Sequence, residues 1–192
     1  MRLFTSTLLS ILTLPLFAQN QFIEDYFPTK DGRIFYQEVV EVDSSKSPNQ
    51  IKKSAKKWAA YLFSNYDAAL ELEGDDFLIF KGYLVKGWTD DRQGAKNWFT
   101  LTVECKEGKF RYTLTNITCE YYVHAKWLSL DYVVHYKEAV EDLIQYSDHE
   151  LPSRKNKYNK YRKEYGDYLH TGFSNMTLSL KKYILASLVE EW

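Results

Sequence analysis

The stretch WFTLTVECKEGKFRYTLTNI, residues 98–117, restricts the possible folds of this chain more than any other. Apolar and polar side chains alternate on both sides of Glu107-Gly108, a pair that suits a two-residue hairpin turn. The register pairs Cys105 with Phe110, and one face is then apolar: Phe99, Leu101, Val103, Phe110, Tyr112 and Leu114. The other face is polar: Thr100, Thr102, Glu104, Arg111, Thr113 and Thr115. This pattern predicts an antiparallel sheet with one buried side.

Cys105 and Cys119 are the only cysteines of the chain. If the register continues without interruption, Phe99 pairs with Asn116 and Cys119 lies opposite residue 96, on the other face from Cys105. The two sulfurs would then be roughly 30 Å apart along the strand. A disulfide requires Cα atoms within about 7 Å, whereas an oxidising compartment would favour one. A bridge therefore requires the chain to double back after the hairpin, and both states stay open.

Two further strands and a helix precede the hairpin. GRIFYQEVVEVD, residues 32–43, alternates as a strand does, and so does DDFLIFKGYLVKGW, residues 75–88, where Gly82 indicates a bulge or a close backbone approach. Between them, Ser47 is a good helix N-cap, with Pro48 at the first helical position and Gln50 completing a capping box. Apolar residues then recur at helical spacing up to residue 63, opposite a lysine face that is typically solvated: Lys52, Lys53, Lys56 and Lys57.

The C-terminal third has a weaker pattern. Residues 126–136 are compatible with a strand or a covering loop, and residues 137–146 with a short helix. Tyrosines recur at helical spacing in the next segment, at Tyr158, Tyr161, Tyr165 and Tyr168. Asn175 suits the N-cap of a last helix that follows it.

The N-terminal residues have the pattern of a secretory signal peptide. One cation, Arg2, precedes an apolar run that ends before Ala18, and this run is too short to span a bilayer. We expect residues 1–18 to be removed, and residues 19–192 to form a single soluble α+β domain in the periplasm or outside the cell. The whole chain has 25 basic and 26 acidic residues, and removal of residues 1–18 takes away Arg2, which leaves 24 and 26 and a formal charge of −2. This balance and the export argue against nucleic acid as a partner.

The segments FPTKDGRIFYQEVVEVDSSKSPNQIKKSAKKW, FLIFKGYLV and EGKFRYTLTNI together resemble the secreted bacterial family called domain of unknown function 4468. The resemblance covers residues 27–122, and it implies a TBP-like fold with a β-α-β-β-β core and a helix packed on a curved antiparallel sheet. We accordingly expect an α+β fold with additional helices in a C-terminal part, residues 123–192. The family implies no activity, and a fold shared with a DNA-binding protein does not indicate DNA binding.

No catalytic, cofactor-binding or metal-binding motif is recognisable. The histidines, His124, His135, His149 and His170, lack the spacing of a zinc site, and the chain has neither a P-loop nor a nucleophile elbow. We therefore expect no catalytic residues, no cofactor and no metal. An enzyme would instead require a concave pocket with perturbed groups, involving His124, His135 or a cysteine.

The strongest candidate for a contact surface is a basic stretch that carries part of the tyrosine stripe. Its members are Arg154, Lys155, Lys157, Tyr158, Lys160, Tyr161, Arg162 and Lys163. A helix of this kind could dock on an envelope protein or on an acidic polysaccharide or lipid surface. The alternative is that the tyrosines pack inside while the cations are solvated. We predict a non-catalytic binding module of the cell envelope; a small periplasmic hydrolase-like enzyme and a glycan- or lipid-surface binding protein are the other possibilities.

Overall fold

The computed structural model describes residues 23–24, 26–86, 92–127, 130–146 and 155–189. In these ranges the strands are β1 (Thr29–Lys30), β2 (Arg33–Ile34), β3 (Tyr36–Glu41), β4 (Leu70–Glu73), β5 (Phe77–Lys86), β6 (Arg92–Lys106), β7 (Lys109–Trp127) and β8 (Leu130–Ala139). The helices are α2 (Pro48–Leu62), α3 (Tyr66–Ala69), α4 (Val140–Tyr146) and α5 (Lys155–Val189). The α+β class expected from the sequence is confirmed.

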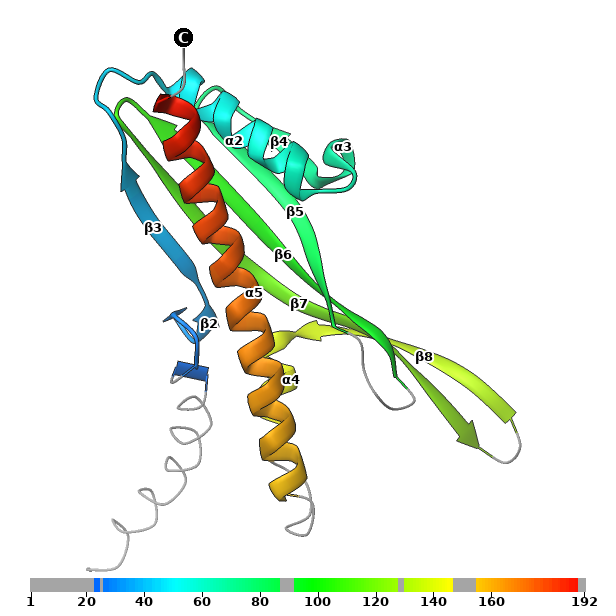
Figure 1. Cartoon of the computed structure of the whole chain (residues 1–192). Coiled ribbons are helices and arrows are strands. Elements are labelled where there is room, and N and C mark those ends of the chain that lie inside the picture. The colour runs from blue at the N-terminus through cyan, green and yellow to red at the C-terminus, as the bar shows by residue number, and fades with distance from the viewer. Residues whose placement is uncertain (1–22, 25, 87–91, 128–129, 147–154, 190–192) are drawn as a thin grey trace, which may run out of the picture.

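Six strands form one antiparallel sheet in the order β3-β7-β6-β5-β4, and β8 also pairs with β7. β3 pairs with residues 109–114 of β7, whereas β8 pairs with residues 118–127. The two strands therefore follow one another along the same edge of β7. Figure 1 shows the strongly twisted sheet, with α2 and α5 lying across it and the β7–β8 pair extending away from them.

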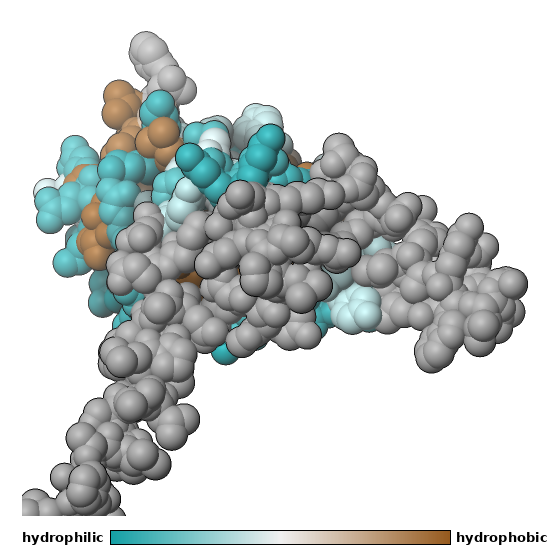
Figure 2. All heavy atoms as spheres, turned by 90° about the horizontal axis from the view of Figure 1, so that it is seen from below, coloured by the Kyte–Doolittle hydropathy of each residue, from teal (hydrophilic) through white to brown (hydrophobic). Residues whose placement is uncertain are grey.

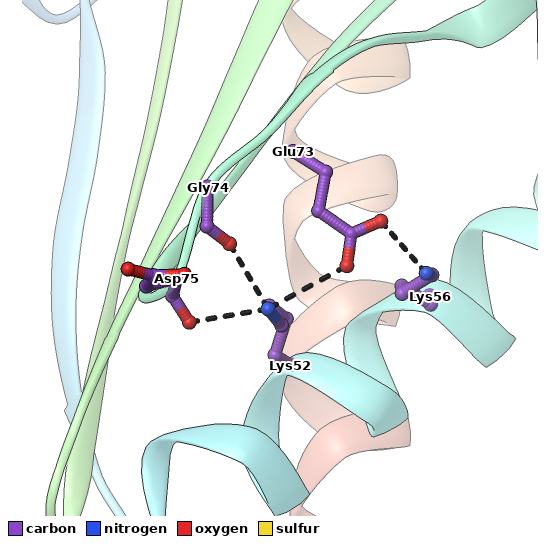
Figure 3. A network of polar contacts seen from close by, with 5 residues as sticks. All are labelled: Lys52, Lys56, Glu73, Gly74 and Asp75. Carbon is purple, nitrogen blue, oxygen red and sulfur yellow. Dashed lines mark hydrogen bonds and ion pairs between the residues drawn. The ribbon is translucent and has the colours of Figure 1, made fainter.

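Helix α2 begins as its sequence predicts. The Ser47 side chain accepts a hydrogen bond from the Gln50 amide, the Gln50 side chain accepts one from the Ser47 amide, and Pro48 is the first helical residue. Two of the four lysines bind the turn between β4 and β5 (Figure 3): Lys52 donates to the carbonyl oxygens of Gly74 and Asp75 and pairs with Glu73, which also binds Lys56. Half of this lysine face thus fixes the helix to the sheet.

The hairpin register is confirmed from the turn up to Thr100, which lies opposite Thr115. Beyond Thr100 the register shifts by one residue, because Trp98 lies opposite Thr118. The extra residue on β7 accompanies a left-handed backbone at Asn116, with φ 53°, which asparagine tolerates better than most residues.

This bulge corrects the expectation for Cys119. One extra residue reverses the facing of the strand beyond it, so Cys119 lies opposite Asn97 and points into the core, as Cys105 does. Both cysteines are buried, and no disulfide joins them.

Gly82 provides a close approach between β5 and two aromatic rings. A Cβ atom at this position would lie 2.6 Å from Cε1 of Phe63 and 2.7 Å from Cζ of Phe99. The sequence-based expectation is confirmed, because only glycine leaves room for these rings over the strand.

Beyond residue 122, β7 continues to Trp127 and is followed by strand β8, so this part of the chain is not helical throughout, as the C-terminal part was expected to be. The strand alternative for residues 126–136 is confirmed, and so is a short helix within residues 137–146, which is α4. The two predicted C-terminal helices are one helix of 35 residues, α5, and Asn175 lies inside it rather than at an N-cap. Its inward residues follow helical spacing through that position: Tyr165, Leu169, Phe173, Met176, Leu180, Ile184 and Leu188. Helix α5 therefore packs continuously against the sheet through Asn175, where the sequence suggested the start of a new helix.

Helix α4 is joined to the N-terminal hairpin by a buried acid. The Glu141 carboxylate accepts a hydrogen bond from the amide of Ile34 at 2.7 Å and lies 3.7 Å from Arg33. Val140 and Ile144 of the same helix belong to the common hydrophobic core. This contact connects residues that are 107 positions apart in the sequence.

Candidate functional site

The basic stretch proposed from the sequence lies at the start of α5. Lys160 and Lys163 are exposed, and Lys160 lies 3.9 Å from Glu164 one turn later. Arg154 lies outside the described residues, as do the side chains of Lys155, Lys157, Tyr158, Tyr161 and Arg162.

The second half of the tyrosine stripe faces the protein. The Tyr165 hydroxyl donates to Oδ1 of Asn97, and the Tyr168 hydroxyl donates to the carbonyl of Val85 at 2.5 Å. Lys86 lies over both rings, 5.4 and 5.3 Å from their centroids. These two tyrosines hold α5 on the sheet, so they are not available to a partner.

Among the side chains that the structure describes, the groups considered for catalysis do not converge. Cys105 is buried, and this burial raises its pKa to about 12, so the reactive thiolate is scarce. Nδ1 of His170 lies 2.9 Å from the hydroxyl of Tyr36, whose pKa is raised by burial. His149 and the side chain of His124 lie outside the described residues.

One shallow cavity of about 380 Å³ lies where the end of α5 meets the loop after β3. It is lined by Val42, Asp43, Ser45, Lys46, Leu185, Leu188 and Val189. None of these residues is a histidine or a cysteine, so this cavity is not the pocket that the enzyme alternative requires. Within the described part of the chain, no three histidine, cysteine or acidic side chains are grouped as metal ligands would be.

The sheet face opposite the buried core, called the open face here, carries the other set of side chains of each strand. It bears exposed apolar groups among charged ones: Val39, Leu72, Tyr83, Val85 and Tyr122. Near the hairpin the charges are paired, since Arg111 donates to both oxygens of Glu104 at 2.6 and 2.7 Å. Figure 2, a view of the molecule from below, shows brown and teal atoms interspersed where described residues are visible.

Aromatic and charged side chains converge on the open face where β5, β6, β7 and β8 lie side by side. The register places them in three successive rows: Tyr83 and Trp98; then Val85, Lys96, Glu120 and Lys137; then Tyr122 and His135. A row of charges therefore lies between two rows of rings. We call Tyr83, Lys96, Trp98, Glu120, Tyr122, His135 and Lys137 the Trp98 cluster.

Glu120 is the centre of this cluster. Its Oε2 accepts a hydrogen bond of 2.5 Å from Nε1 of Trp98, and its Oε1 lies 3.0 Å from Nε2 of His135. Partial burial raises the pKa of the carboxyl, but the hydrogen bonds from Trp98 and His135 outweigh it, so the pKa is lowered overall. Glu120 is therefore an ionised anchor that fixes the orientation of the indole and the imidazole.

The rings are in mutual contact and remain accessible. Tyr83 and Trp98 have centroids 4.8 Å apart, and Tyr122 stacks on His135 at the same distance. Tyr83 is 46% and Tyr122 40% exposed. Such an arrangement offers flat apolar surface with polar groups at its edges, which suits binding rather than catalysis.

The sequence contained a partial signal for this cluster. Trp98 occupies a position that the hairpin alternation assigns to the polar face, and a large aromatic ring there calls for a partner or a ligand. The remaining members come from β5, β7 and β8, and only the sheet register brings them to Trp98.

Comparison with protein families identifies the central part of the chain. Residues 36–120 match the family described as domain of unknown function (DUF4468) with TBP-like fold. The resemblance to the DUF4468 family is thus confirmed. The matched residues contain Tyr83, Lys96, Trp98 and Glu120, and they end before the other three members of the Trp98 cluster.

Two solved structures are similar to the chain. One is a TBP-like protein from Parabacteroides distasonis ATCC 8503, the other a DUF4468 family protein from Bacteroides ovatus ATCC 8483. Each has 16% sequence identity to this chain, a TM-score of 0.46 and an alignment that covers 81% of this chain. The alignment covers 97% of the Parabacteroides distasonis protein and 90% of the Bacteroides ovatus protein. No curated protein matches the chain. Among the described helices, none has the length and apolar character needed to cross a membrane.

Proposed function

We propose that this chain is an exported, non-catalytic binding module of the cell envelope, and that the Trp98 cluster is its main contact surface. The observation that carries the proposal is the grouping of two exposed tyrosines, Tyr83 and Tyr122, with the partly exposed Trp98 on one face of the sheet. Aromatic side chains supply much of the energy of binding interfaces, and exposed apolar side chains that are grouped together often mark an interaction site.

The rigidity of the cluster supports this role. The Trp98 ring is held by Glu120, the Tyr122 ring is stacked on His135, and both lie on central strands of the sheet rather than on loops. A ligand that meets fixed side chains loses less conformational entropy on binding than one that must order them.

The location is part of the proposal. The signal-peptide pattern of residues 1–18 supports export, and these residues lie outside the described ranges. The basic stretch at the start of α5 is a second proposed contact surface, supported by the exposure of Lys160 and Lys163.

The experiment compares two tyrosines of similar exposure on opposite faces of the β7–β8 pair. Tyr122 belongs to the Trp98 cluster, whereas Tyr136 is 43% exposed and stacks on Tyr121, whose side chain faces the core side. Residues 19–192 and the variants Tyr122→Ala, Trp98→Ala and Tyr136→Ala would be incubated with immobilised envelope polymers: peptidoglycan, lipopolysaccharide and capsular polysaccharide. We expect one of these polymers to retain the parent protein and the Tyr136→Ala variant. The same polymer should not retain the Tyr122→Ala and Trp98→Ala variants.

Thermal unfolding of each variant separates loss of binding from loss of fold. Equal retention of all four proteins would refute the role of the Trp98 cluster. Failure of the folded parent protein to bind any of the three polymers would contradict the proposed role as an envelope-binding module.

A further inference from the structure

Building on the proposed function, we infer that the Trp98 cluster binds an acidic polysaccharide, with sugar rings against Tyr83, Trp98 and Tyr122 and sugar carboxylates bound by Lys96 and Lys137. The inference depends on the positions of the two lysines and on the chemistry of the rings around them.

The two lysines flank Glu120 in one row across three strands. Lys96 on β6 lies opposite Glu120 on β7, which in turn lies opposite Lys137 on β8. Neighbouring strands are about 4.8 Å apart, so the two lysine backbones are separated by about 10 Å. The two lysine backbones therefore lie on either side of the Glu120 backbone, in the row between the two rows of rings.

The positive charges exceed the negative charge at this position. Both lysines are exposed, and neither comes within ion-pairing distance of a carboxylate among the residues that the structure describes. The ammonium group of Lys96 instead lies over the Tyr83 ring at 5.1 Å, and that of Lys137 over the Trp98 ring at 5.8 Å. The carboxylate of Glu120 is already engaged by Trp98 and His135. The chain as a whole has a net charge of −1, so this local excess is complementary to an anionic ligand.

A ligand carboxylate would displace the lysines from the rings. A charge-assisted hydrogen bond between an ammonium and a carboxylate is stronger than an exposed cation–π contact. Each lysine would move toward the ligand and uncover the ring beneath it. The same event would thus create the ion pair and the flat apolar surface for a sugar ring.

Sugar polymers match this surface better than other polyanions. A pyranose ring presents a flat face of C–H groups together with hydroxyls, and tyrosine and tryptophan combine an apolar ring with a polar group in the same way. An acidic peptide has no such flat face. Nucleic acid has flat bases, but its dense phosphates favour a strongly basic protein, and this chain is acidic overall.

The test uses two polymers that share the same sugar chain, one with free carboxylates and one without. Residues 19–192 would be titrated with polygalacturonate and with its methyl ester, in which the carboxylates are blocked. The lysine variant is Lys96→Gln/Lys137→Gln, and the control is Lys53→Gln/Lys57→Gln, which makes the same charge change at two exposed positions of α2. We expect the parent protein and the control to bind polygalacturonate at least about tenfold more tightly than the ester, and the lysine variant to lose this preference.

Other results would separate this inference from the proposed function. Equal binding of both polymers, abolished by Trp98→Ala, would overturn the acidic class while leaving the Trp98 cluster as the contact surface. Binding of poly-glutamate or oligo-thymidylate as tight as that of polygalacturonate would overturn the assignment to sugars. Binding of polygalacturonate unaffected by Trp98→Ala and by the lysine variant would overturn both.

Discussion

The ammonium group of Lys181 on α5 lies 2.5 Å from Oε1 of Glu38 on β3, which joins the longest helix to an edge strand of the sheet. The other oxygen of Glu38 accepts a hydrogen bond of 2.8 Å from the hydroxyl of Tyr112. The hydrogen bonds from Lys181 and Tyr112 lower the pKa of Glu38 below its usual 4.5. The contact therefore stabilises the fold in its ionised form.

Glu38→Gln should lower the free energy of unfolding by up to about 1 kcal/mol at pH 7, since the carboxylate is partly exposed and screened by water. A group with a lowered folded-state pKa stabilises the protein above its unfolded pKa and loses this effect as the pH falls through the folded value. The difference from the parent protein should thus shrink as the pH falls below 4.5. Urea unfolding of the variant and of the parent protein at several pH values measures this difference in the free energy of unfolding. Glu41→Gln, an exposed change on the same strand, is the control; an equal loss there would contradict the prediction.

Cys105 and Cys119 should be unreactive in the folded protein. Burial raises the pKa of Cys105 to about 12, and Cys119 is fully buried, so neither presents an accessible thiolate. Iodoacetamide at pH 8 should modify neither thiol in buffer and both in guanidinium chloride, as followed by mass spectrometry. Rapid labelling of the native protein, or a mass that shows a disulfide, would contradict the structure.

Gly82→Ala should destabilise the fold by about 1–3 kcal/mol, because the added methyl group would overlap the rings of Phe63 and Phe99. Gly166→Ala is a suitable comparison. Its Cβ would lie 3.3 Å from the ring of Tyr26, which is partly exposed, and alanine favours helix over glycine by about 1 kcal/mol. Thermal denaturation should show a clearly lower melting temperature for Gly82→Ala and little change for Gly166→Ala.

Tyr165→Phe should lower the free energy of unfolding by about 1–3 kcal/mol, because it removes the hydroxyl that donates to the buried amide oxygen of Asn97. Tyr168→Phe removes a hydroxyl in a partly exposed position, where water can replace it, and should cost less. Chemical unfolding of the two variants tests this order. The reverse order would mean that Asn97 is not the main attachment point of α5.

The mature protein should begin at Gln19. Expression of the full chain in a bacterium with a general secretion pathway, followed by intact-mass analysis of the envelope fraction, measures the cleavage site. Recovery of uncleaved protein starting at Met1, with its mass unchanged, would remove the basis for export.

Local sequence signals determined several elements of this fold. The alternation around Glu107-Gly108 defined the hairpin register as far as Thr100, and Ser47, Pro48 and Gln50 defined the start of α2. These predictions succeed because the interacting residues are close in sequence, so the turn and the cap have few alternatives.

The tertiary structure decided the features that depend on distant residues. A single bulge at Asn116 exchanged the two faces of β7 beyond it, so that the Cys119 side chain points into the core. The alternation of apolar and polar residues does not reveal where such an extra residue is inserted. Packing of α5 along the sheet carried the helix through Asn175, where the local capping preference suggested a new start. The Trp98 cluster needs Tyr83, Glu120 and His135 from three other strands. Each strand alone shows only scattered polar and aromatic residues, and pairing between them turns those residues into one surface.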